Sequence, residues 1–277
     1  MEKDIEKEIA EFNQALSTVI SIDNSQIGKP GFAHDESLKY SEGLGRKLIN
    51  HCLTCNYLIR GFQPTIKQDL FQPIVDFASV FVLARAAFET YLTFNYLFVS
   101  YPSPEVKEFR FLCWDLSGYL DRADMIAKDP KHVQRKNTEA ILIESIKEQI
   151  KQHSYFQGKT ERFQESALTG KWRLNNQWHN LATASGFQKK HFVDIYGFLC
   201  SYSHSSRLSI IQIQQNKSFK EQQEMTLHTM NLLKMVLSKY IHDYVSIIPA
   251  LNEAVDLNKP EYFLIRLWKL AAEKFEQ

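Results

Sequence analysis

Two charged side chains inside an apolar stretch, and a histidine in a later helix-like segment, are the groups in this sequence best suited to chemistry. Arg85 and Glu89 lie within DFASVFVLARAAFETYLTFNYLF (76–98), and His204 lies within YGFLCSYSHSS (196–206). A histidine can take up or release a proton near neutral pH, and a positioned arginine can stabilise a developing negative charge. We therefore treat His204, Arg85 and Glu89 as candidate catalytic residues.

Each of these residues also has a structural interpretation. The spacing of four places Arg85 and Glu89 on one helix face, and a charge in an apolar helix is costly unless it is paired. The pair is therefore either a structural ion pair that closes a helix junction or the lining of a cleft. His204, taken alone, is more simply explained as a helix-end histidine that is hydrogen-bonded to a carbonyl.

Tyr196 and Ser203 share one helical side with His204, so both are candidate binding residues. Ser203 is not a nucleophile activated by His204, because neighbouring residues on a helix point in different directions.

Residues 122–190 combine basic and aromatic side chains. They hold 13 Lys and Arg against 7 Asp and Glu, whereas the whole chain has a net charge of +1. Basic groups interleaved with aromatic rings suit single-stranded nucleic acid, whose bases stack while its phosphates pair. Lys171, Arg173 and Trp178 are the candidate binding residues here. The alternative is a solvated surface with ordinary loop aromatics.

No motif for a metal or a cofactor is visible. Cys52 and Cys55 form a C-x-x-C, but no second pair completes the four ligands that structural zinc needs. Free thiols in a reducing cytoplasm are the simpler interpretation. There is no Walker loop and no G-x-G-x-x-G. The sequence therefore predicts no metal and no cofactor.

The stretch that carries Arg85 and Glu89 predicts one long helix, apolar nearly all round. Such a helix is either buried among other helices or spans a membrane, for which about 20 apolar residues suffice. The two charges at its centre favour the buried central helix of a soluble protein. The polar start, MEKDIEKEIAEF, shows no signal peptide, so we expect a cytoplasmic protein without membrane association.

The rest of the chain predicts further helices and no sheet, since no stretch shows sustained alternation. A loop is expected over 21–35, and short helices with a long ordered loop over 152–187. The other expected helices cover 2–21, 36–59, 104–127, 138–150, 187–204, 217–253 and 261–275. The predicted fold class is all-α, a multi-helix bundle.

Two of these motifs carry a resemblance. LARAAFETYLTFNYLF (83–98), a tryptophan-bearing polar loop and IYGFLCSYSHSS (195–206) together resemble an uncharacterised bacterial all-helical domain family. That family is similar to the HEPN superfamily of helical bundles, many of which are ribonucleases in toxin–antitoxin and phage-defence systems. The resemblance covers roughly residues 70–215. It implies a HEPN-like core at 67–277 and an N-terminal helical extension at 1–66 packed on that core.

By this resemblance, one cleft between two packed helices would be lined by Arg85, Glu89, Tyr196, Ser203 and His204. Ribonuclease members carry an arginine a few residues before the catalytic histidine. Here Gly197, Phe198 and Leu199 stand at that spacing, and Arg207 follows the histidine instead.

Two hypotheses follow, and the sequence leaves open whether the protein is an enzyme. In the first, the protein is a metal-independent ribonuclease of a defence system. His204 would act as general acid and base on a 2′-hydroxyl, and Arg85, held by Glu89, would stabilise the phosphate charge. In the second, the protein is a non-catalytic helical module that binds a partner protein, a nucleotide or a nucleic acid such as RNA, or forms a homodimer. The same residues would then be a polar network that fixes helix register.

Overall fold

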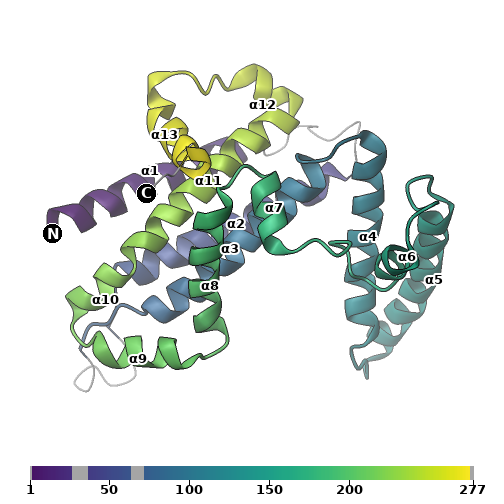
Figure 1. Ribbon diagram of the computed structural model, residues 1–277, viewed down its shortest axis with the longest axis horizontal. Helices are drawn as coiled ribbons and strands as arrows, with labels where there is room; N and C mark the ends of the chain where they lie inside the picture. Colours follow the sequence, from purple (N-terminus) through teal and green to yellow (C-terminus); the bar gives the residue numbers. More distant parts are fainter. Residues whose placement is uncertain (1, 27–36, 64–71, 275–277) are drawn as a thin grey trace. The chain divides into compact units, whose positions relative to one another are not determined.

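The computed structural model describes residues 2–26, 37–63 and 72–274. The fold is all-α, a multi-helix bundle, as the sequence predicts (Figure 1). Within the described residues the one β-type pairing is an isolated bridge between Phe62 and Ile74.

In chain order, the helices are α1 (Glu2–Asn24), α2 (Leu38–Ile59), α3 (Phe77–Phe98), α4 (Pro104–Ala123), α5 (Pro130–Gln152), α6 (Glu161–Leu168), α7 (Trp178–Ala184), α8 (Lys189–Ser203), α9 (Arg207–Gln215), α10 (Phe219–Met225), α11 (Leu227–Ile247), α12 (Pro249–Ala254) and α13 (Phe263–Lys274). A short 3₁₀ turn, Pro260–Tyr262, precedes α13.

The chain forms two compact units. The first unit joins Met1–Asn95 to Ala182–Gln277, and the second unit is Tyr96–Leu181. The boundary predicted after residue 66 lies within 64–71, outside the described residues, and it stays a prediction.

The first unit is organised around α3 and α11. Aromatic rings of α3 make T-shaped contacts with rings of α8 and of α11, a geometry that packs well in cores. Phe81 of α3 lies 4.6 Å from Tyr202 of α8, and Phe94 of α3 lies 4.9 Å from Tyr240 of α11, measured between ring centroids. Helices α1 and α13 both pack on α11, and α2 packs on α1.

A buried lysine joins three helices of the first unit. Lys234 of α11 is fully buried and is paired with Glu8 and Glu11 of α1; its ammonium lies 2.9 Å from a carboxylate oxygen of Glu11. The same ammonium lies 3.9 Å from the ring centroid of Trp268 of α13. A buried charge is tolerated only when it is paired in this way, so Lys234 fixes how α1 and α13 meet α11.

The second unit has its own hydrophobic core between α4, α5 and α6. Phe109, which is fully buried on α4, stacks on Phe163 of α6 at 5.9 Å between ring centroids. Ile143, Ile146 and Ile150 supply the buried face of α5. A core of this kind is what allows a segment to be compact by itself.

The central helix is mostly buried, as expected. By length and composition α3 could cross a membrane, yet 61% of its apolar window is buried inside the molecule. This burial is typical of the core helix of a soluble protein.

The prediction of a single helix over 217–253 is wrong. The structure has α10, α11 and α12 there. Pro249 has no N–H to continue α11 and is instead the first residue of α12, where proline is favoured. Between α10 and α11, the N–H of Thr226 turns back to the carbonyls of Gln223 and Glu224, which ends α10.

Two other helices differ from the expectation. Helix α5 begins at Pro130, eight residues before the predicted start, because the Asp129 carboxylate accepts the N–H of Lys131 and caps it. Helix α9 was not predicted, and it starts where Ser206 accepts the N–H of Ser209. The short helices expected in 152–187 are present as α6 and α7.

Candidate polar site on helices α3 and α8

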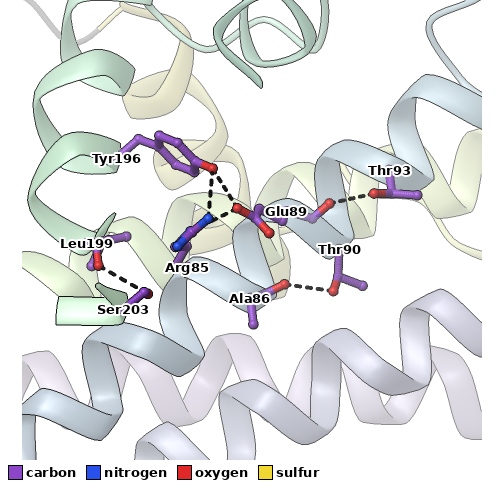
Figure 2. A network of polar contacts seen from close by, with 8 residues as sticks. All are labelled: Arg85, Ala86, Glu89, Thr90, Thr93, Tyr196, Leu199 and Ser203. Carbon is purple, nitrogen blue, oxygen red and sulfur yellow. Dashed lines mark hydrogen bonds and ion pairs between the residues drawn. The ribbon is translucent and has the colours of Figure 1, made fainter. Parts of the chain in front are cut away.

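Three of the candidate residues form one hydrogen-bonded group in the first unit (Figure 2). Arg85 Nε donates to Glu89 Oε1 at 2.9 Å, and the Tyr196 hydroxyl donates to the same oxygen at 2.6 Å. Arg85 Nη2 lies 3.5 Å from the Tyr196 oxygen. Figure 2 shows Tyr196 reaching from α8 to the charged pair on α3. The spacing of four brings the charges together, and the tyrosine ties them to a second helix.

Aromatic packing holds Tyr196 in place. Its ring stacks on Phe192, one helical turn earlier, at 5.0 Å between centroids. Phe192 in turn contacts Phe88 of α3 at 5.3 Å. The charged pair therefore lies beside an aromatic contact between α3 and α8, and its side chains keep partial access to solvent, at 21% for Arg85 and 25% for Glu89.

At neutral pH the network consists of an arginine cation, a carboxylate acceptor and a neutral phenol. Burial raises the pKa of Tyr196, and the bond to Glu89 raises it further, so the phenol keeps its proton at neutral pH. Burial alone would lower the pKa of Arg85, but Glu89 and Tyr196 outweigh it and raise the pKa. Within the group, Arg85 Nε and the Tyr196 hydroxyl both donate to Glu89 Oε1, while Arg85 and Glu89 keep partial access to solvent.

Ser203 lies at the end of α8 outside this group. Its hydroxyl is 3.5 Å from the carbonyl oxygen of Leu199, one turn back on the same helix (Figure 2). In the described part of the chain, it makes no hydrogen bond to Arg85, Glu89 or Tyr196.

His204 ends α8 and is exposed. Ser205 follows in the left-handed conformation, with φ of 51°, and the N–H of Ser206 reaches back to the carbonyl of Ser201 at 2.9 Å. This is the hydrogen bond that closes many helix C-termini. Among the described residues, the His204 imidazole has no hydrogen bond or ion pair, and it is not joined to Arg85 or Glu89.

The other candidate binding residues belong to the second unit. The Arg173 guanidinium lies over the ring of Trp178 at 4.5 Å, and Trp172 contacts the same ring at 6.3 Å between centroids. Both Arg173 and Trp178 are half-buried, and Lys171 is exposed. Arg173 and Trp178 therefore keep partial exposure to solvent while they contact each other.

The loop that carries Lys171 and Arg173 is held in place by its neighbouring residues Leu174 and Asn175. Leu174 and Asn175 have left-handed backbone, with φ of 52° and 70°, which costs energy for residues other than glycine. Leu174 is buried in the core of the second unit, and the Asn175 side chain accepts a bond from Ser166 at 3.2 Å. The conformation is therefore determined by packing.

The described residues contain no group of three or more His, Cys, Asp or Glu side chains that could hold a metal ion. Cys52 and Cys55 are buried free thiols on α2. Burial raises the pKa of Cys55 to about 12 and that of Cys52 well above its usual range. Both sulfurs are therefore protonated at neutral pH, whereas metal ligands must be thiolates.

A second buried network on α3 was missed. Asp243 of α11 accepts bonds from the Tyr91 hydroxyl and the Asn95 amide, each at 2.8 Å. The pair Tyr91 and Asn95, four apart in an apolar helix, was the available signal. Burial raises the pKa of Asp243. Tyr91 and Asn95 are buried and Asp243 is half-buried, so we interpret the network as a structural link between α3 and α11.

Comparisons with protein-family models, curated proteins and solved structures find no match for this chain. The site is therefore interpreted from its geometry and from the resemblance of its motifs.

Proposed function

We propose that the protein is a HEPN-like helical protein that binds single-stranded RNA. The observation that carries the proposal is the contact between Arg173 and Trp178, with Lys171 beside it in the chain. A planar cation and an exposed ammonium on one loop, beside an aromatic ring at the start of α7, offer both a stacking surface and phosphate partners. By the resemblance of its motifs, the protein would act in the cytoplasm within a bacterial defence or toxin–antitoxin system, alone, as a homodimer or with a partner protein.

The network of Arg85, Glu89 and Tyr196 has a structural role in this proposal. Its charges are paired and its phenol is used, so it fixes the register of α8 on α3. Of the Arg85 donors, Nε is bonded to Glu89 and Nη2 lies 3.5 Å from the Tyr196 hydroxyl, so the network holds the guanidinium in one orientation.

The exposure of His204 favours a second candidate function, metal-independent RNA cleavage. An exposed imidazole without a protein partner can act as a general acid or base, and partial exposure leaves Arg85 within reach of solvent. This candidate requires that a bound RNA, or a movement of the end of α8, brings His204 and Arg85 to one phosphate.

RNA binding is tested by fluorescence anisotropy with a labelled, mixed-sequence, single-stranded 12-mer RNA at low salt. We expect Trp178→Ala to weaken binding about tenfold or more, since stacking contributes ~1–3 kcal/mol per base. Lys171→Gln should weaken binding less and reduce its salt dependence. Tyr57→Ala and Lys220→Gln, which remove an exposed ring and an exposed charge in the first unit, serve as matched controls. Equal affinity of Trp178→Ala and wild type would refute the proposed contact.

Cleavage is tested separately by incubating the labelled RNA with wild type and with His204→Ala in excess EDTA. Cleavage by wild type alone would establish the second candidate and give His204 its role. Binding without cleavage by either protein would favour the binding module.

A further inference from the structure

An open pocket in the second unit lies where α4 and α5 meet near the turn between them. Its volume is about 520 Å³. Its lining comes from the last turns of α4 and the first three turns of α5 and consists of Tyr119, Arg122, Lys131, Gln134, Arg135, Thr138, Glu139 and Leu142. No candidate residue of the proposed RNA contact or of the polar site on α3 and α8 is among them.

Two arginines share one carboxylate in this pocket. Arg122 Nη2 lies 2.9 Å from Glu139 Oε1, and Arg135 Nε lies 3.9 Å from the same oxygen. The Glu139 side chain is the least accessible of the three, at 11% exposed, whereas those of Arg122 and Arg135 are 48% and 70% exposed. Arg122 is therefore closely paired with Glu139, Arg135 lies at the longer ion-pair distance, and both guanidinium groups remain accessible to solvent.

Lys131 adds a third positive charge that is not neutralised. Among the described residues its ammonium has no ion pair or hydrogen bond, while its backbone N–H is used by Asp129. Glu139 is the one carboxylate in the lining, so the lining carries an excess of two positive charges.

The pocket also faces the favourable end of a helix. Lys131, Gln134 and Arg135 belong to the first two turns of α5, where the helix dipole favours an anion. The Asp129 carboxylate caps this end and offsets part of that field, so the side-chain cations carry most of the attraction.

The walls fit a ligand larger than a bare anion. The Arg122 guanidinium lies over the ring of Tyr119 at 5.3 Å, and Leu142 adds apolar surface. Volumes of this size are typical of sites for small organic ligands.

We infer that this pocket binds a phosphate monoester. Such a group carries a charge of about −1.5 to −2 at neutral pH and three acceptor oxygens, which matches the excess of two charges and the free donors of two arginines. A phosphodiester carries a single charge and leaves the pocket half-neutralised. The inference is independent of the proposed RNA contact, because none of its residues takes part in that contact.

The monoester can come from a free nucleoside monophosphate or from the 5′ end of a nucleic acid. Isothermal titration calorimetry of the full chain at low ionic strength separates these sources. The titrants are inorganic phosphate, a nucleoside 5′-monophosphate, and one hexaribonucleotide with a 5′-phosphate or a 5′-hydroxyl. Saturable binding of the monophosphate identifies a small-molecule site, and tighter binding of the 5′-phosphorylated than of the 5′-hydroxyl hexamer identifies a chain-end site.

The variants locate the binding. We expect Lys131→Gln to weaken binding of the phosphorylated ligand several-fold, and Arg122→Gln with Arg135→Gln to weaken it at least about tenfold, because each loses a charge-assisted hydrogen bond. The Lys131 ammonium has no ion pair or hydrogen bond in the described residues, so its variant tests the pocket even where the double variant fails to fold. Arg162→Gln, which removes an exposed charge of α6 outside the pocket, is the matched control.

The inference is overturned by any of three results: no phosphorylated ligand saturates at millimolar concentration, Lys131→Gln binds as tightly as wild type, or the 5′-hydroxyl hexamer binds as well as the phosphorylated one while the monophosphate does not bind. A loss of RNA affinity in Trp178→Ala together with unchanged binding of every phosphorylated ligand in Lys131→Gln would support the proposed function and refute the pocket, and the converse would do the reverse.

Discussion

Arg85 and Glu89 illustrate what residue spacing can and cannot predict. Their spacing of four on an apolar helix predicted a shared face, and their side chains form an ion pair there. The contact with Tyr196 lay beyond spacing, since it depends on how α8 packs on α3, and only the resemblance of the motifs implied it. The position of His204 depends on where α8 ends, and the sequence pattern did not predict the left-handed conformation of Ser205 at that end.

Removing the Tyr196 hydroxyl tests the structural role of the polar site. We expect Tyr196→Phe to lower the free energy of unfolding by about 1 kcal/mol, because the 2.6 Å bond to Glu89 is lost while the ring remains. Urea denaturation measures this change. Tyr57→Phe is the control, since that side chain is 64% exposed and should change stability little. Unchanged stability in Tyr196→Phe would argue against a structural role.

The lowered pKa of His242 predicts that the protein loses stability in mild acid. Burial, and then the nearby Lys269 and Lys239, lower its pKa to about 4 in the folded protein from 6.5. A lowered folded-state pKa means that the unfolded chain binds the proton first. The contribution of neutral His242 to the free energy of unfolding is therefore present above about pH 6.5 and is lost as pH falls towards 4.

Guanidinium denaturation at pH 7, 6, 5 and 4.5 measures this loss. We expect the wild-type midpoint to fall more steeply with acid than that of His242→Gln, which has no proton to gain. The comparison with the variant is needed because burial raises the pKa of neighbouring Asp243, which acts in the opposite direction. Parallel curves for the two proteins would contradict the assignment.

At the scale of elements, composition and periodicity predicted most helices, whereas proline residues and capping side chains determine where the helices begin and end. The helix predicted over 104–127 begins where expected, because Pro104 is its first residue and the Ser103 side chain accepts the N–H of Val106. The apolar periodicity of 217–253 continued across Pro249, so the sequence predicted one helix where proline divides the chain. Periodicity describes which face is buried, and it carries little information on where hydrogen bonding stops.

Two glycines of α2 offer a matched test of helix packing. A Cβ at Gly45 would lie 1.9 Å from the Tyr240 hydroxyl oxygen, whereas a Cβ at Gly43 would meet nothing within 4 Å. We expect Gly45→Ala to destabilise the protein by ~1–3 kcal/mol through overpacking. Gly43→Ala should stabilise it by ~0.5–1 kcal/mol, because alanine loses less conformational entropy in a helix.

Thermal and urea denaturation of both glycine variants measure these opposite signs. If Gly45→Ala were as stable as Gly43→Ala, the close contact between α2 and α11 would be contradicted.

At the scale of the molecule, the chain returns to its first unit after building its second. Sequence composition predicted a long polar interruption over 152–187, but the second unit begins earlier, inside the last turn of α3. No local signal marks that point, since Asn95 and Tyr96 lie within one continuous helix. Contacts distant in sequence define the units, and a single sequence does not contain them.

The separate cores predict separate responses to a core mutation. We expect Phe109→Ala to destabilise the second unit by ~3–5 kcal/mol, because a fully buried ring among Phe163, Tyr155 and Phe156 is removed. Hydrogen exchange followed by mass spectrometry should show faster exchange in α4–α6. Amides of α11 should exchange as in wild type, and equal acceleration in α11 would show that the two cores unfold together.

The pairing of Lys234 with Glu8 and Glu11 has a consequence for biosynthesis. Helix α1 is synthesised before the other described helices, and its partners on α11 and α13 are synthesised only after the second unit. The second unit is complete before any residue of Ala182–Gln277 exists. At roughly 5–20 residues per second, α1 waits on the order of ten seconds or more for α11 and α13, with α2 as its one described partner from the first unit that is already synthesised and packs on it. During that interval the nascent chain is a natural client for a chaperone, and the second unit is the part that can already be folded.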